Sequence, residues 1–155
     1  MRAIIPLMCG ATLLGSPLFA DRPSLDAGAA PTQSSTSKTS RGLEITATGV
    51  EHAAKASLKD CPPGANTVSA TAKPGEEFAI ISLNFKVLPA FKPGTFRRPV
   101  LTDAAGKTYN TAASLVNVGK VPEFSCEIPF RVPNGTKAKS VEIEDATIDL
   151  TRLEK

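Results

Sequence analysis

The chain has 155 residues, with 18 Lys and Arg, 15 Asp and Glu, one His, three Cys and no Trp. This length suits one domain, or one domain with a tail. The formal net charge of +3 is too small to indicate a nucleic-acid partner, and a single His excludes a His-rich metal site. The 13 Pro and 11 Gly argue against long helices, because both residues interrupt them. The composition therefore indicates a class of protein and not a specific activity.

Residues 1–20 have the three-part layout of a secretory signal peptide. Arg2 carries the only charge, an apolar run follows it, and Ala20 stands before a charged pair. The run is short and is interrupted by Gly and Pro, unlike a membrane-spanning helix. A short buried helix or a membrane anchor is the alternative. We predict export to the periplasm or beyond, cleavage after Ala20 and no membrane span after cleavage. The small residues 27–29 offer a second cleavage site. Cys9 lies inside the apolar run, so it is a poor site for lipid attachment.

Residues 21–41 are rich in Ser, Thr and Pro, and Leu25 is their only large aliphatic residue. Such a segment buries too little apolar surface to offset the entropy lost on ordering. We therefore predict a flexible linker over residues 21–41, followed by one folded domain over residues 42–155.

Alternation of apolar and polar side chains predicts strands in the folded part. The clearest candidates are residues 42–50, 78–87 and 123–132. Pro129 cannot donate to a strand ladder, which places the last of these at a sheet edge or beside an unpaired stretch. Weaker strands are predicted at residues 68–72, 99–102, 107–111 and 114–118.

The C-terminal segment predicts two further strands with a change of parity between them. The apolar residues Val141 and Ile143 are at odd-numbered positions, and Ile148 is at an even-numbered one. This one-residue shift predicts a β-bulge near Asp145. Residues 52–58 fit either a strand or a helical turn, because Ala is frequent among them. About seven or eight short strands, with no strand–helix–strand alternation, predict an all-β antiparallel two-sheet sandwich.

Cys61 and Cys126 remain after the predicted cleavage. An oxidising compartment and an even count favour a disulfide between them, and two free buried thiols are the alternative. Cys126 lies on the apolar face of its strand, and Cys61 lies in a Pro-rich loop. One His and two Cys are too few for a structural zinc site, and a blue-copper site needs a second His. We predict no metal and no cofactor.

His52 is the one His available for catalysis, and no nucleophile-elbow pattern accompanies it in the chain. An acidic group is consistent with a calcium site or with glycosidase carboxylates; its members are Glu142, Glu144, Asp145 and Asp149. Simple solvent-facing alternation along a strand explains Glu142 and Glu144. We therefore predict no catalytic residue, and the single His together with the lack of motifs disfavours an enzyme.

The Gly/Pro-rich segment at residues 91–99 is the candidate binding loop. It combines Phe91 and Phe96 with Arg97 and Arg98. Loops on a rigid sandwich commonly carry recognition, and aromatic and Arg side chains are frequent interface anchors. The alternative is a solvated basic loop whose two Phe side chains fill the end of the core.

Three stretches in order resemble an immunoglobulin-like family of exported bacterial proteins. Residues 73–85 (KPGEEFAIISLNF) are similar to its glycine, aromatic and long alternating strand, and residues 100–109 (VLTDAAGKTY) to its hairpin. Residues 129–143 (PFRVPNGTKAKSVEI) resemble its turn and closing strand. The family is a domain of unknown function found in lipoproteins and in a mycobacterial secreted antigen. The resemblance implies an immunoglobulin-like sandwich exported from a bacterium, and it assigns no catalytic residue. Unlike that family, this chain lacks a lipoprotein Cys after its signal and has the Cys61/Cys126 pair.

These features lead us to expect an exported, non-enzymatic binding or interaction module of the bacterial envelope. Its expected partner is a protein or an envelope component, and its oligomeric state is not indicated by the sequence. The alternative is a small protein inhibitor of an extracellular hydrolase, because sandwich inhibitors present rigid loops.

Overall fold

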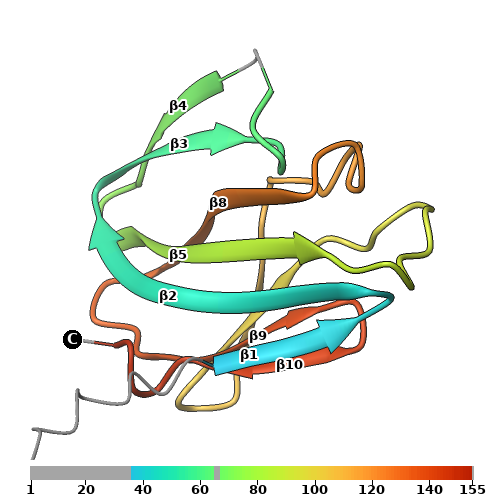
Figure 1. Ribbon diagram of the computed structural model, residues 1–155. Helices are drawn as coiled ribbons and strands as arrows, with labels where there is room; N and C mark the ends of the chain where they lie inside the picture. The colour runs from blue at the N-terminus through green and yellow to red at the C-terminus, as the bar shows by residue number, and fades with distance from the viewer. Residues whose placement is uncertain (1–35, 65–66, 155) are drawn as a thin grey trace, which may run out of the picture. The chain divides into compact units, whose positions relative to one another are not determined.

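The computed structural model describes residues 36–64 and 67–154, which form ten strands (Figure 1). In chain order they are β1 (Thr36–Ser40), β2 (Leu43–Ala53), β3 (Lys55–Lys59), β4 (Thr67–Thr71), β5 (Glu76–Val87), β6 (Val100–Asp103), β7 (Thr108–Asn110), β8 (Glu123–Pro133), β9 (Ala138–Ile143) and β10 (Ala146–Asp149). Within these described ranges, no helix has the length and apolarity that crossing a membrane requires. The predicted signal peptide and the part of the predicted linker before residue 36 lie outside the described residues.

Two four-stranded antiparallel sheets form a β-sandwich. Their strand orders are β1-β2-β5-β8 and β10-β9-β6-β7, and apolar side chains from both sheets join in one buried cluster. A third, two-stranded sheet is the hairpin β3–β4, which lies outside the first sheet beside β8 and β5 (Figure 1). The predicted all-β antiparallel sandwich is confirmed. The described residues contain ten strands, more than the seven or eight expected, because several of them are too short or too polar to show an alternating pattern.

Strand β5 shows why alternation predicts this fold. It is central in the first sheet and pairs with β2 on one side and β8 on the other. Ala79, Ile81, Leu83 and Phe85 share its inner face, and each is at most 2% exposed. Burying one large apolar side chain contributes about 1.5–3 kcal/mol, so this alternating face fixes the sheet against the core.

The folded domain begins earlier than the sequence predicts. Residues 36–40, assigned above to the linker, form β1 and pair with β2. The main-chain ladder is supplemented by side chains, since Thr46 Oγ1 donates to Ser37 Oγ at 3.2 Å and Ser40 Oγ donates to Asp145 Oδ1. Apolar patterning misses this strand because its side chains are polar, although Thr has a high strand propensity. The turn that follows requires Gly42, whose φ is +78° and where a Cβ would collide with the Phe91 backbone.

Residues 52–58, which fit either a strand or a helical turn, belong to two strands. His52 and Ala53 end β2, and the chain then continues as β3. A register shift between Ala47 and Gly49 interrupts the pairing of β2 with β5. An irregularity of this kind bends a strand and increases its twist. In Figure 1, β2 curves away from the sheet before the hairpin β3–β4 follows.

Two predictions for the C-terminal half of the chain are wrong. The predicted bulge near Asp145 is instead a two-residue hairpin turn, because Ile143 pairs directly with Ala146. Directly paired residues face the same side, which accounts for the parity change. Residues 114–118 do not form a strand: Leu115 makes only an isolated bridge with Cys61, and Val116 is 38% exposed.

The disulfide Cys61–Cys126 is present, with the two Cα atoms 5.8 Å apart. Strand β8 is at the edge of the first sheet, as Pro129 predicted. The segment after β7 lies along that edge, where Thr111 Oγ1 donates to the Pro129 carbonyl at 2.7 Å. Cys61 N in turn donates to the Ser114 carbonyl at 2.8 Å. The loop after β3 is therefore fixed to β8 both covalently and through a neighbouring segment.

Candidate functional site

The predicted binding loop, residues 91–99 (below, the basic loop), connects β5 of the first sheet to β6 of the second. Its two aromatic side chains turn inward. Phe96 is 9% exposed and belongs to the core, and Phe91 packs against the core half-buried. Their rings stack with centroids 6.2 Å apart and planes 4° from parallel. Both side chains therefore fill the end of the core, which is the alternative interpretation given above for them.

Arg41, in the turn between β1 and β2, holds the basic loop in place. Its guanidinium donates to the carbonyls of Thr95 at 2.9 Å and Lys92 at 3.3 Å. The same group lies 4.5 Å from the centroid of the Phe96 ring and 3.5 Å from Glu144 Oε2. A planar cation with five donors suits such a site, because it can bind several carbonyls and stack on a ring at once. One side chain thus fixes both the path of the loop and the position of its buried ring.

The two Arg residues of the basic loop have different surroundings. Arg97 donates through its main-chain N to Glu144 Oε1 at 2.5 Å and through Nη2 to the Glu144 carbonyl at 2.6 Å. The neighbouring Asp145 has a lowered pKa, mainly because the Ser40 hydroxyl donates to it and also because Arg97 and Arg41 are close. Arg98 is exposed and has no hydrogen bond or ion pair with any described residue. The Lys92 ammonium is also exposed and unpaired within the described ranges.

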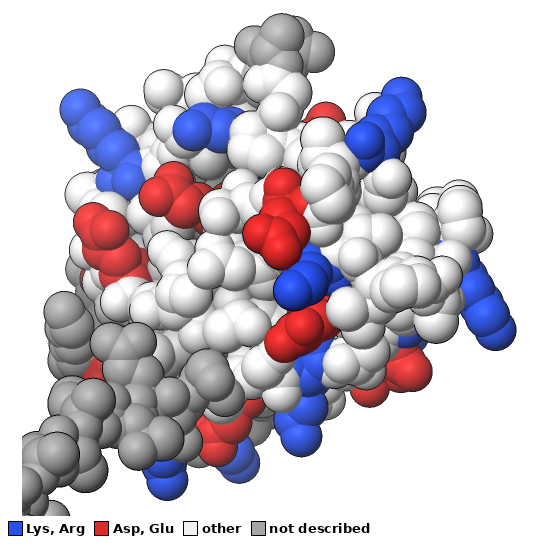
Figure 2. All heavy atoms as spheres, in the orientation of Figure 1, with Lys and Arg blue, Asp and Glu red and all other residues white. Residues whose placement is uncertain are grey.

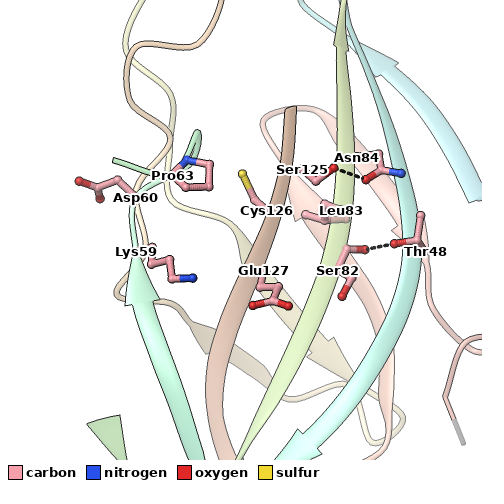
Figure 3. Close-up of a pocket in the computed structure, with 10 residues that line it drawn as sticks. All are labelled: Thr48, Lys59, Asp60, Pro63, Ser82, Leu83, Asn84, Ser125, Cys126 and Glu127. Atoms are coloured by element: carbon pink, nitrogen blue, oxygen red, sulfur yellow. Dashed lines mark hydrogen bonds between the residues drawn. The ribbon is translucent and has the colours of Figure 1, made fainter. Parts of the chain in front are cut away.

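A second candidate site is a hollow of about 380 Å³ on the outer face of the first sheet, which we call the polar trough (Figure 3). The outer faces of β2, β5 and β8 form its floor, and the end of β3 with the loop after it forms its wall. Its lining residues are Thr48, Lys59, Asp60, Pro63, Ser82, Leu83, Asn84, Ser125, Cys126 and Glu127. The Cys61–Cys126 disulfide anchors this wall to the floor.

The polar trough is lined by small polar groups whose bonding capacity is partly unused. Ser125 Oγ donates to Asn84 Oδ1 at 2.7 Å, and Thr48 Oγ1 donates to the Ser82 carbonyl at 3.2 Å. The Asn84 amide NH₂ and the Ser82 hydroxyl have no partner among the described residues. Such groups can donate to and accept from a bound polar ligand.

Charged groups of both signs line the same hollow. Lys59, Asp60 and Glu127 form no ion pair with one another or with any other described residue. In Figure 3 the Lys59 side chain extends from β3 toward the side of the trough where Glu127 projects from β8. The Asp60 carboxylate points away from the sheet, to the outer side of the loop (Figure 3). The trough therefore offers one cation, that of Lys59, and one carboxylate, that of Glu127, to a ligand.

Sequence reasoning missed the polar trough. Thr48, Ser82 and Ser125 are scattered through three strands, where each one fits the polar, solvent-facing half of an alternating pattern. Only the hairpin β3–β4 and the disulfide loop, by lying over that face, turn it into a concave site. The predicted Cys61–Cys126 pair was the one signal in the sequence that linked this loop to β8.

His52 has a structural environment. Its Nδ1 lies 3.0 Å from Glu77 Oε1, and its Nε2 lies 2.8 Å from Glu154 Oε1. Each carboxylate also accepts from a main-chain N, Glu77 from Gly135 at 2.9 Å and Glu154 from Ala138 at 3.2 Å. Both ring nitrogens are thus engaged by carboxylates, and neither contacts a hydroxyl that could act as a nucleophile. The ring joins β2 and β5 to the segment after β10.

Other charged groups are dispersed over the surface. Figure 2 shows Lys and Arg interspersed with Asp and Glu over the visible face, without a continuous area of one sign. Among the described residues, no cluster of three or more His, Cys, Asp or Glu side chains is arranged to hold a metal ion.

Comparison with known proteins gives little further information. No protein-family model matches the chain, and no curated protein matches it. It is similar to the crystal structure of an uncharacterized β-sandwich protein from Clostridium difficile 630, with a TM-score of 0.45 and 10% sequence identity. The similarity covers 72% of this chain and 85% of that chain. These values assign neither a family nor a function to the chain.

Proposed function

We propose that this protein is an exported, non-enzymatic interaction module of the bacterial envelope, acting in the periplasm or outside the cell. The apolar N-terminal segment supports export, and the Cys61–Cys126 disulfide is compatible with an oxidising compartment. The resemblance to immunoglobulin-like exported proteins supports the same class. The environment of His52, with both nitrogens on carboxylates, supports a non-enzymatic role.

The proposed contact surface is the basic loop, and the observation that carries this proposal is its preorganisation. Arg41 fixes the main chain of the loop through hydrogen bonds to two of its carbonyls. The charged groups of Lys92 and Arg98 are exposed and unpaired within the described part of the chain. A loop that is already ordered loses little entropy on binding, which favours affinity. Two unpaired cations favour an acidic protein surface as the partner, because complementary charge steers association.

A small protein inhibitor of an extracellular hydrolase is the second candidate function. The same rigidity favours it, since an inhibitor must present an exposed segment without rearranging. In this case Arg98 would enter an acidic pocket of the target enzyme. Stoichiometric inhibition of one member of a panel of secreted proteases and lysozymes, abolished by Arg98→Glu, would establish this function in place of the first.

The test of the proposed function is capture from the native envelope fraction with a charge-reversed variant. Lys92→Glu/Arg98→Glu reverses both unpaired cations of the basic loop. Lys38→Glu/Lys73→Glu is the matched control, because these two exposed cations lie elsewhere and the charge change is equal. Each variant and the unmodified chain are cross-linked to envelope extracts, and captured proteins are compared by mass spectrometry.

We expect one or a few acidic proteins that the unmodified chain and the control capture and that the loop variant does not. Binding of the purified partner would then weaken with rising salt, because the interaction is between exposed charges. A capture profile unchanged in the loop variant would contradict the placement of the contact on the basic loop.

A further inference from the structure

We propose that the polar trough is a second binding site, independent of the basic loop, for a zwitterionic ligand, a free amino acid or short peptide. The ligand would carry a free ammonium group and a free carboxylate. The trough lies on the outer face of the first sheet and shares no lining residue with the basic loop.

The arrangement of charge defines the ligand class. The Lys59 ammonium on the wall and the Glu127 carboxylate on the floor face the trough (Figure 3), and neither has an ion-pair partner among the described residues. The cation can bind a ligand carboxylate, and the carboxylate can bind a ligand ammonium. A zwitterion matches this set. Phosphates and other anions match it less well, because the Glu127 carboxylate repels them.

The neutral groups on the floor fit the amide of a peptide. The Asn84 NH₂ group is free to donate because only its Oδ1 is engaged, by Ser125. The Ser82 hydroxyl can donate and accept. A peptide unit has one N–H donor and one C=O acceptor, so these two side chains can bind it in one orientation.

The lining also excludes two other ligand classes. No aromatic side chain lines the trough, so a sugar would find no ring on which to stack. Of the apolar residues that line it, Leu83 and Cys126 are buried in the core. Only Pro63 adds apolar side-chain surface, which is too little for an apolar ligand. The volume of about 380 Å³ lies within the range of small-molecule sites, about 300–1,000 Å³.

Nuclear magnetic resonance titration with L-lysyl-L-alanine tests this assignment. We expect amide shifts confined to the strand segments and loop that line the trough. Glu127→Gln should weaken binding by about tenfold, the loss expected when one charge-assisted hydrogen bond is removed. Glu142→Gln, an exposed carboxylate on β9 of the other sheet, is the matched control and should bind as the unmodified chain does.

A second pair of changes tests the carboxylate contact. Lys59→Gln should weaken binding of L-lysyl-L-alanine, but it should not alter the weaker binding of L-lysyl-L-alaninamide, which lacks the carboxylate. Circular dichroism confirms that each variant is folded. Equal binding of the two dipeptides by the unmodified chain would overturn the proposal. So would binding of maltotriose or inorganic phosphate in preference to the dipeptide, or an absence of shifts in the trough. None of these results depends on capture through the basic loop.

Discussion

The basic loop and the polar trough differ in how much of their bonding capacity the fold itself uses. The loop has conspicuous residues, but Phe91 and Phe96 pack inward and Arg97 is bound to Glu144. The trough combines ordinary Ser, Thr and Asn residues, several of which keep free donors and acceptors, with charged residues that form no ion pair among the described residues. The comparison teaches that availability for a ligand depends on tertiary partners and not on how unusual a residue is in the sequence.

The largest difference between the two regions should follow loss of the disulfide. Cys61→Ser/Cys126→Ser removes a bond between residues separated by 65 positions, for which the chain-entropy model gives about 4 kcal/mol of stability. Urea unfolding with and without reductant measures this loss. Hydrogen exchange at 4 °C should rise in the wall at residues 60–63 and stay unchanged in the basic loop. An equal rise in both regions would contradict their separate anchoring.

A smaller effect, confined to the other region, should follow Arg41→Met. This change removes the hydrogen bonds to the Thr95 and Lys92 carbonyls and the contact with the Phe96 ring. We expect a loss of about 1–2 kcal/mol, measured by urea unfolding, and faster hydrogen exchange in residues 92–97. Arg98→Met is the control, because an exposed and unpaired side chain contributes within about 0.5 kcal/mol. Similar losses in both variants would show that Arg41 does not hold the loop.

Acid should produce the smallest of these effects, again on the side of the basic loop. The Ser40 hydroxyl lowers the pKa of Asp145 in the folded state. A depressed pKa contributes stability that is complete above the unfolded value of about 3.9 and is lost as the pH falls through the lower folded value. Urea midpoints should therefore fall below about pH 4, and they should fall less in Asp145→Asn than in the unmodified chain. The control Glu142→Gln should retain the slope of the unmodified chain.

The fold could be predicted largely because its longest strands follow the alternation of apolar and polar side chains. Alternation in residues 78–87 and 123–132 identified the inner faces of β5 and β8, and Pro129 placed β8 at a sheet edge. The predicted export and the even cysteine count identified the Cys61–Cys126 bond. These inferences depend on a local pattern of side chains or on whether the cysteine count is even. Both can be read from one sequence.

The remaining features depend on contacts that no local pattern encodes. Strand β1 is polar and is held mainly by main-chain pairing with β2, so its composition resembles that of a linker. Residues 114–118 alternate like a strand, but they pair with none of the described strands. Their main chain is hydrogen-bonded to Cys61 through Ser114 and Val116. The trough arises only when a hairpin lies over a sheet face, and the holding role of Arg41 depends on carbonyls more than 50 positions away.

The position of the two cysteines has a consequence for biosynthesis. Cys61 is made 65 residues before Cys126, and chains emerge from the ribosome with the N-terminal part first. The thiol of Cys61 therefore remains without its native partner until β5, β6 and β7 have been translated. A chain that stops before β8 would leave this thiol without its native partner. The closed bond is thus a chemical mark of a chain synthesised at least as far as β8, while β9 and β10 still follow it in the sequence.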